Sequence, residues 1–380
     1  MEYSIPFNRV FISGNELQYI EQSIANSHVS GDGPFTLRCH ALLNTYFSSP
    51  KSLLTTSCTH ALEISAMLLD IKPGDEVIIP AYTFVSTVNA FVRQGAKPIF
   101  VDIRPDTLNI DECLIEQNIT QRTRAIIVVH YAGVGCELDE IQRIAREYDI
   151  PVIEDNAHGM FGRYRGQKLG TFGIVSALSF HETKNISCGE GGALIINDPR
   201  YIERAEIIRE KGTNRSRFFR GQVDKYTWVD IGSSYLPSDM LAAFLFAQLE
   251  AEELIQAKRK SIWHKYHQGL LDWADTNRIS VPFIPNHCEQ PYHMYYLLMP
   301  SLDNRDAFIK HLKDQGILSV FHYLPLHLSK MGRKFGGEPG SCPITEDISD
   351  RLVRLPFFTG MGESEEQRVI DTIVSFNTNI

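Results

Sequence analysis

An acid and a lysine follow two successive apolar segments near the middle of the chain. Asp155 ends the segment Val-Ile-Glu-Asp at 152–155, and Lys184 follows Ser-Phe-His-Glu-Thr at 179–183. Taken singly, the ordinary roles are a helix cap or an exposed lysine, but together they are the pair that pyridoxal phosphate requires. The lysine amine can bond to the cofactor aldehyde, and the acid can keep the pyridine nitrogen protonated. We therefore predict catalytic roles for Lys184 and Asp155.

Small polar side chains upstream of this pair could bind a phosphate. Ser57, Cys58 and Thr59 stand at a predicted helix start, where free backbone N–H groups favour an anion. A simple helix cap is the ordinary role of such residues. Phe84 follows an apolar run and offers a ring that could cover a flat heterocycle, although a core position is its ordinary role. The order in which all four elements occur favours a cofactor site.

Short apolar runs alternate with helix-like segments, and this pattern supplies the elements that would position the site. The predicted strands are 76–80, 98–101, 125–129, 151–153, 176–180 and 193–196, with helices at 59–69 and 137–148 among the segments between them. The alternation predicts an α/β fold with an open, mostly parallel wound sheet. Ligands bind such sheets at the carboxyl ends of the strands, where the reactive side chains fall.

The amino-acid composition of the chain changes after Ser238. From there to about His267 the chain lacks Pro and Gly, which predicts one long helix. A smaller αβ pattern follows, with a strand at 294–298, a helix at 306–315 and a strand at 317–320. Because 380 residues exceed one ordinary core, we predict a large domain over 1–245 and a small C-terminal domain over 246–380 that contains the connecting helix.

Composition excludes several classes of protein. The net charge of -9 argues against general affinity for nucleic acid or for anionic membranes. No apolar run reaches the roughly 20 residues that span a bilayer, and no signal peptide is evident. Seven cysteines occur singly, without metal-ligand spacing. We expect a cytoplasmic protein with reduced thiols and no bound metal.

The motifs in this order resemble the nucleotide-sugar aminotransferases of the DegT/DnrJ/EryC/StrS type, a branch of the aspartate-aminotransferase fold (fold type I). The resembling segments run from 11–14 and 30–36 to 322–327 and so cover most of the chain. The segment 211–228 is most similar to the branch that aminates TDP-4-keto-6-deoxyglucose in enterobacterial common antigen synthesis. The resemblance implies a large domain that binds pyridoxal 5'-phosphate and a smaller C-terminal αβ domain.

The resemblance also assigns roles to single residues. It implies that Lys184 bonds to the cofactor, that Asp155 faces the pyridine nitrogen and that His158, where relatives often have Gln, lies near the phenolic oxygen. Positions that match phosphate and ring contacts are Ser57, Cys58, Thr59, Ser179 and Phe84. Many relatives have a Gly-Tyr-Asn-Tyr-Arg pattern whose Asn reaches the neighbouring subunit's site. The Gly-Ser-Ser-Tyr-Leu stretch at 232–236 leaves that contact open here.

A sugar nucleotide is anionic, so an acidic chain must supply cations locally. The stretch 211–228 offers Arg215, Arg217, Arg220, Lys225 and Tyr226, and we hypothesise that it helps to bind the sugar nucleotide, in this subunit or its partner. A solvated basic loop is an equal alternative. His322 and His327 match a family motif in the small domain, and the sequence leaves open whether they line the site or make local hydrogen bonds.

The implied reaction transfers the amino group of L-glutamate to dTDP-4-keto-6-deoxy-D-glucose. The products are dTDP-4-amino-4,6-dideoxy-D-galactose and 2-oxoglutarate, made by a homodimer with shared active sites. The alternative within the family is the gluco epimer, with a 3-keto sugar as a weaker possibility. A sugar dehydratase would carry His in place of Lys184, a non-catalytic regulatory protein would need no such lysine, and a Rossmann dehydrogenase would need an early GxGxxG that this chain lacks.

Overall fold

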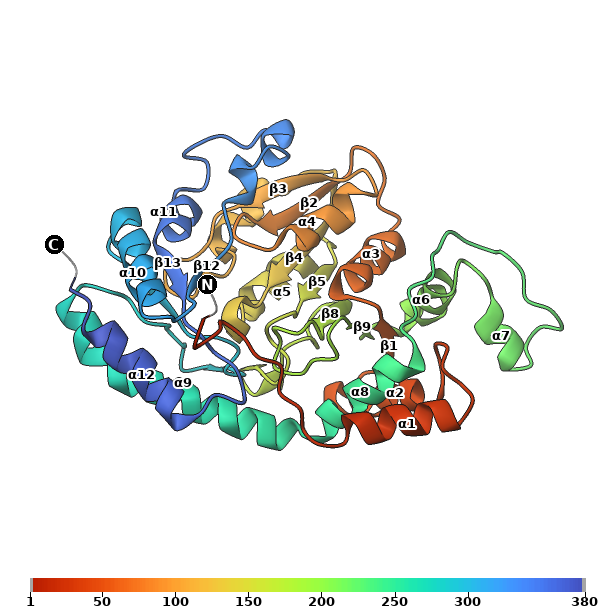
Figure 1. Ribbon diagram of the computed structural model, residues 1–380. Helices are drawn as coiled ribbons and strands as arrows, with labels where there is room; N and C mark the ends of the chain where they lie inside the picture. The colour runs from red at the N-terminus through yellow and green to blue at the C-terminus, as the bar shows by residue number, and fades with distance from the viewer. Residues whose placement is uncertain (1–2, 378–380) are drawn as a thin grey trace.

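A seven-stranded sheet forms the centre of the computed structural model, which describes residues 3–377 (Figure 1). Its strands are β1 (Lys51–Thr55), β2 (Glu76–Pro80), β3 (Lys97–Val101), β4 (Thr123–Val129), β5 (Val152–Asp155), β8 (Val175–Ser179) and β9 (Gly192–Ile196). The order is β1-β9-β8-β5-β4-β2-β3, and β9 is antiparallel to both its neighbours, whereas the other pairs are parallel. The predicted mostly parallel sheet is confirmed.

Both faces of this sheet are covered, which explains the continuous apolar runs. Val77 and Ile79 of β2 belong to one core and Ile78 to the core on the opposite face. The helices of this half are α1 (Glu16–Ala25), α2 (Pro34–Phe47), α3 (Cys58–Leu68), α4 (Val85–Val92), α5 (Leu138–Glu147), α6 (Ile202–Arg209), α7 (Arg215–Phe219) and α8 (Asp239–Glu250). All six predicted strands are present, and β1 is a seventh that the sequence did not predict.

The C-terminal part builds a second core around a three-stranded sheet of order β11-β13-β12. Its elements are α9 (Glu252–Thr276), β11 (Tyr296–Leu298), α10 (Leu302–Asp314), β12 (Val320–Phe321), α11 (Pro343–Arg351), β13 (Leu352–Arg354) and α12 (Glu363–Val374). Another small sheet joins β10 (Cys288–Glu289) to β6 (Arg163–Tyr164) and β7 (Gln167–Lys168). Single-turn 3-10 helices lie at Glu112–Leu114, Glu116–Asn118, Tyr131–Gly133, Pro199–Tyr201, Leu326–Leu328 and Gly332–Phe335.

Two expectations about this region were wrong. The single helix expected from Ser238 to about His267 is two helices, because the backbone of Ala251, at φ -92 and ψ 13, interrupts it. The break lets α8 pack with α2 while α9 lies along α12 (Figure 1). The strand expected at 317–320 is instead β12 at Val320–Phe321, which shares only Val320 with the expected range. The domain boundary at 245/246 falls inside α8, and the division into two domains stays a prediction.

The carboxylate of Asp102, the residue after β3, fixes the C-terminal part against the large sheet. One oxygen accepts hydrogen bonds from the N–H (2.8 Å) and hydroxyl (2.7 Å) of Thr345, and the other accepts from the N–H of Ile344 at 2.8 Å. These N–H groups belong to the first turn of α11, where a helix leaves its donors unpaired. Asp102 therefore caps α11 from a distant part of the chain.

Within residues 3–377, no helix is both long and apolar enough to cross a membrane.

We predict that Asp102→Ala destabilises the protein by about 3 kcal/mol, because two N–H groups of α11 lose a buried charged acceptor. Urea unfolding followed by circular dichroism measures this loss. Asp314→Ala is the matched control, since Asp314 is 57% exposed and, among the described residues, forms an ion pair only with Lys310 on the surface. It should change the free energy of unfolding by less than about 1 kcal/mol. Equal stability of the two variants would contradict the role of Asp102.

Candidate active site

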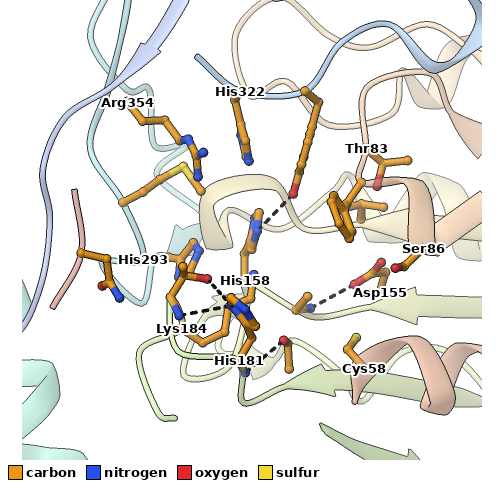
Figure 2. A pocket seen from close by; sticks show the side chains of 18 of the residues that line it. Cys58, Thr83, Ser86, Asp155, His158, His181, Lys184, His293, His322 and Arg354 are labelled. Atoms are coloured by element: carbon orange, nitrogen blue, oxygen red, sulfur yellow. Dashed lines mark hydrogen bonds between the residues drawn. The ribbon is translucent and has the colours of Figure 1, made fainter. Parts of the chain in front are cut away.

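A cavity of about 730 Å³ lies at the carboxyl ends of β4, β5 and β8, and the C-terminal part closes one side of it. It brings together nine residues predicted from the sequence, which are Ser57, Cys58, Thr59, Phe84, Asp155, His158, Ser179, Lys184 and His322. Figure 2 shows several of these side chains from both halves of the chain around one space. The proximity of Asp155 and Lys184 follows from the sheet, in which β5 pairs directly with β8.

Asp155 presents a buried carboxylate at the end of β5. One oxygen accepts a hydrogen bond from the Thr87 hydroxyl at 2.7 Å, and the other accepts from the N–H of Ala157 at 3.2 Å. Burial raises the pKa of Asp155, while these hydrogen bonds and the charge of Lys184 oppose the rise. A carboxylate held this way is fixed in position, and a cation placed opposite it would favour its charged form.

Lys184 occupies the turn between β8 and β9 and lines the same cavity as Asp155. Desolvation lowers the pKa of Lys184 to about 8, although the nearby Cys58 and Asp155 oppose the shift. Part of its amine is therefore neutral near pH 7, as a nucleophile and a general base require. The acid and the lysine that the sequence analysis paired therefore interact electrostatically in the folded protein.

The start of α3 provides a place for an anion. Ser57 caps the helix by accepting a hydrogen bond from the N–H of His60 at 3.2 Å, which leaves the N–H groups of Cys58 and Thr59 without intrahelical partners. Gly192 at the start of β9 lets the two backbone segments lie close together, because it has no side chain. A Cβ on Gly192 would lie only 2.4 Å from the backbone nitrogen of Cys58.

Aromatic and imidazole rings form the opposite wall. The rings of His158 and His293 stack with centroids 4.3 Å apart, and the Tyr323 hydroxyl lies 3.4 Å from Nε2 of His158. His322 contacts the Tyr131 hydroxyl through Nδ1 at 2.6 Å. Desolvation lowers the pKa of His158, His293 and His322 well below the usual range. These three imidazoles are therefore neutral at physiological pH.

Several residues lie in the site although the sequence analysis gave them no role. Thr87 orients Asp155 from the first turns of α4, and Arg354 of β13 lines the cavity. His293 is held through Nδ1 by Asn185, the neighbour of Lys184, at 2.9 Å. The fully buried Arg259 donates to the backbone carbonyl of His293. No local motif marks these residues, because each acts through a partner far away in the sequence.

The residues of the basic stretch lie away from the cavity within a single chain. Arg220 pairs with Glu206 at 2.8 Å, Arg215 pairs with Glu210 at 3.0 Å, and Arg217 pairs with Glu203. Figure 1 shows the loop with α7 projecting beyond α6 at one edge of the molecule. Lys225 and Tyr226 are exposed on it. Their predicted contact with a sugar nucleotide would have to be made in a partner subunit, and it stays a prediction.

His327 also lies outside the cavity. It is fully buried, and its Nε2 contacts Glu346 at 2.9 Å. Of the two alternatives left open for it, the structure shows a local hydrogen bond. His322 lines the cavity and His327 does not, because the turn at 326–328 directs the ring of His327 away from the site.

The donor set fits pyridoxal phosphate. A phosphate would meet the free N–H groups at the start of α3, where Gly192 leaves space that a Cβ would fill. A pyridine nitrogen would meet the buried Asp155, and an aldehyde would meet the amine of Lys184. Nδ1 of His158 is buried without a hydrogen-bond partner, as a contact with a polar ring substituent would explain. Phe84, 55% exposed, stands at the cavity edge.

Comparison with known proteins covers nearly the whole chain. The pattern of the DegT/DnrJ/EryC1/StrS aminotransferase family matches residues 11–374. The chain is 36% identical to the protein MJ1066 of Methanocaldococcus jannaschii, covering 98% of this chain and 97% of that protein. Among solved structures, the chain is similar to Spr1654 of Streptococcus pneumoniae, which is provisionally described as a sugar aminotransferase and was solved in a PMP form. The two chains are 27% identical and superpose with a TM-score of 0.91, over 98% of this chain and 97% of that chain.

A third relative is the aminotransferase TlmJ of Streptoalloteichus hindustanus. It is 28% identical, with a TM-score of 0.88 over 99% of this chain and 98% of that chain. Spr1654 has also been solved in a PLP form, which is 26% identical to this chain, with a TM-score of 0.89 over 99% of this chain and 98% of that chain.

The lowered pKa of Lys184 makes a testable prediction for the cofactor-free protein. The rate of covalent capture of pyridoxal phosphate should rise with pH through a midpoint of about 8, because only the neutral amine attacks an aldehyde. Stopped-flow absorbance follows the capture, and Lys184→Ala supplies the background from other lysines.

In the Asp155→Asn variant this midpoint should shift to lower pH, since the carboxylate charge favours the protonated lysine. A wild-type midpoint near 10, the ordinary range of a lysine, would contradict the desolvated environment.

Proposed function

The chain belongs to the DegT/DnrJ/EryC1/StrS aminotransferase family, and from that membership we propose that it aminates dTDP-4-keto-6-deoxy-D-glucose. Its cofactor is pyridoxal phosphate, and it is a sugar aminotransferase. The proposed amino donor is L-glutamate, and the proposed products are dTDP-4-amino-4,6-dideoxy-D-galactose and 2-oxoglutarate. The observation that carries the chemistry is the single cavity that holds Lys184 and Asp155 together.

Each residue has a distinct task in this reaction. When bound, pyridoxal phosphate supplies an aldehyde that takes up the amino group. Its ring delocalises the negative charge that develops on the carbon to which this amino group is attached. Lys184 removes a proton from that carbon through its Nζ and returns it on the other side of the transfer, as a base and then an acid. Asp155, fixed by Thr87, stabilises positive charge at the ring nitrogen.

The choice of sugar nucleotide is supported by the stretch 211–228, which is most similar to the branch that uses this keto sugar. The loop is exposed on a single chain, with Phe219 at 70% and Trp228 at 77%. Exposed aromatic rings beside arginines suit a contact with a sugar nucleotide bound in another copy of the chain. We therefore include a homodimer with shared sites in the proposal.

The first test is the structure of the sugar product. The protein is loaded with pyridoxal phosphate and incubated with L-glutamate and dTDP-4-keto-6-deoxy-D-glucose, and the product is solved by NMR. A small coupling between the protons at sugar positions 3 and 4 means an axial amino group and the galacto product. A large coupling would assign the gluco epimer instead. Failure to form any amino sugar would reject this acceptor.

Lys184→Ala should reduce the overall turnover to background, because the variant loses the covalent link and the proton carrier together. A coupled assay for 2-oxoglutarate measures this turnover. The protein should still fold, as circular dichroism can check, since Lys184 lines a cavity. Turnover above background in this variant would refute the role of Lys184.

Arg220→Ala tests the basic loop. We expect the apparent KM for the sugar nucleotide to rise roughly 10-fold or more through loss of a charge-assisted contact. The half-reaction with L-glutamate should keep its rate. Arg200→Ala is the control, because Arg200 pairs with Asp198 on the surface outside the loop. An unchanged KM for the sugar nucleotide would exclude Arg220 from binding it.

A further inference from the structure

His293 is an imidazole of the cavity wall, and its hydrogen-bond partners show which ring nitrogen carries the hydrogen. The side-chain nitrogen of Asn185 donates to the carbonyl oxygen of Pro291 at 2.7 Å, so the side-chain oxygen of Asn185 faces His293. That oxygen can only accept, and Nδ1 of His293, 2.9 Å away, must therefore be the donor. Because desolvation lowers the pKa of His293 well below its usual range, the ring is neutral and Nε2 keeps a free lone pair.

The lone pair on Nε2 is open to the cavity. Among the described residues 3–377, no group forms a hydrogen bond with Nε2, and the atom is not one of those buried without a partner. His293 lines the cavity together with Lys184, and Figure 2 shows both side chains around the same space. Nε2 is therefore a neutral hydrogen-bond acceptor that a ligand in the cavity can reach.

Contacts with the backbone, the face and the edge of His293 fix the direction of this lone pair. The buried Arg259 donates to the backbone carbonyl of His293, and the ring of His158 stacks on its face at 4.3 Å with an interplanar angle of 20°. Asn185 holds the edge of the ring and follows Lys184 directly in the chain. The acceptor is therefore oriented, beside the reactive amine, before a ligand enters the cavity.

The ligands of the two half-reactions differ in the groups that they offer to such an acceptor. L-Glutamate reacts through its amine and otherwise brings two carboxylates, which only accept hydrogen bonds. The keto sugar brings ring hydroxyls at positions 2 and 3, and each can donate. The diphosphate of the sugar nucleotide offers acceptors only. Since His293 is 7% exposed and lies deep in the wall, the pyranose beside the reacting carbon is the part of the sugar nucleotide that suits it.

We propose that Nε2 of His293 accepts a hydrogen bond from a ring hydroxyl of the keto sugar and so selects the sugar in the second half-reaction. The inference rests on the proposed function, because it requires a hydroxylated keto sugar as the acceptor. Asn185 is then a positioning residue, which acts by fixing the tautomer and the direction of the imidazole. His293 has no such contact to make in the half-reaction with L-glutamate.

Two substitutions of His293 separate substrate binding from a structural role. Asparagine keeps a nitrogen donor for Asn185 near the place of Nδ1 but removes Nε2, whereas glutamine puts an oxygen acceptor near the place of Nε2 and loses the contact with Asn185. We expect His293→Asn to lower kcat/KM of the aminated enzyme for the sugar nucleotide about 10-fold, the loss of one hydrogen bond, and His293→Gln to lie closer to the wild type. The reverse order would mean a structural role and overturn the proposal.

Binding without turnover gives the second readout. Isothermal calorimetry on the pyridoxal-phosphate form should show that His293→Asn binds dTDP-4-keto-6-deoxy-D-glucose about 10-fold more weakly than the wild type does. Its affinity for dTDP, which lacks the pyranose, should be unchanged. His264→Asn, which alters an exposed histidine of α9, is the matched control and should bind both ligands as the wild type does. Equal weakening for dTDP and the sugar nucleotide would overturn the proposal.

The half-reaction with L-glutamate, followed by cofactor absorbance in stopped flow, should keep its rate in His293→Asn. An equal slowing of both half-reactions would instead assign His293 to the amine of Lys184, which takes part in both, and would overturn the proposal.

Deoxy analogues of the sugar nucleotide identify the hydroxyl. The wild type should lose about 10-fold in kcat/KM with the 2-deoxy or the 3-deoxy sugar, and the same analogue should cost His293→Asn little more. Fully additive losses would overturn the proposal. If cofactor absorbance shows that His293→Asn does not load, the wild type and His293→Gln decide, and equal rates with all three sugars would overturn it.

Failure of the proposed function gives a different result. A wild-type enzyme that reacts with L-glutamate but not with the sugar nucleotide would reject the acceptor, and this inference with it. A wild type that aminates the sugar nucleotide no faster than His293→Asn does would overturn this inference alone.

Discussion

The opposition of Asp155 and Lys184 in a desolvated cavity is the constraint on which the rest of the site depends. Burial raises the pKa of the acid and lowers that of the amine, and each charge partly offsets the shift of the other. The pair is possible because β5 and β8 are adjacent parallel strands whose carboxyl ends meet at one edge of the sheet. Thr87 and Gly192 then supply the orientation and the space that the pair needs.

The C-terminal part covers one side of the cavity and so contributes to the desolvation of Asp155 and Lys184. Asp102 fixes the start of α11 to the large sheet, and Arg259 fixes the carbonyl of His293. Asn185, adjacent to Lys184, contacts the same histidine and so joins the two halves beside the reactive amine. Loss of these contacts would admit water, and water would return the pKa of Lys184 toward its ordinary value.

The same desolvation determines which side chains of the cavity carry a charge. Neutral imidazoles can offer hydrogen bonds without competing for an anion, because their pKa values lie far below the usual range. The two cations then differ in chemistry: Lys184 changes its proton, whereas an arginine such as Arg354 stays charged. The cavity therefore contains both a group that can transfer a proton and a group with a permanent positive charge.

The sequence by itself determined the class of fold and the reactive pair. Strands buried on both faces of a parallel sheet are short apolar runs, so six of seven were visible in local composition, and the positions of Asp155 and Lys184 after two of them indicated one site. Only the tertiary structure revealed strand β1 and the break between α8 and α9 at Ala251. It also showed that His327 lies outside the cavity and that Arg354 lines it. These features depend on contacts between distant segments, such as the hydrogen bond that the N–H of Ile344 donates to Asp102 across 242 positions, and no local pattern encodes such contacts.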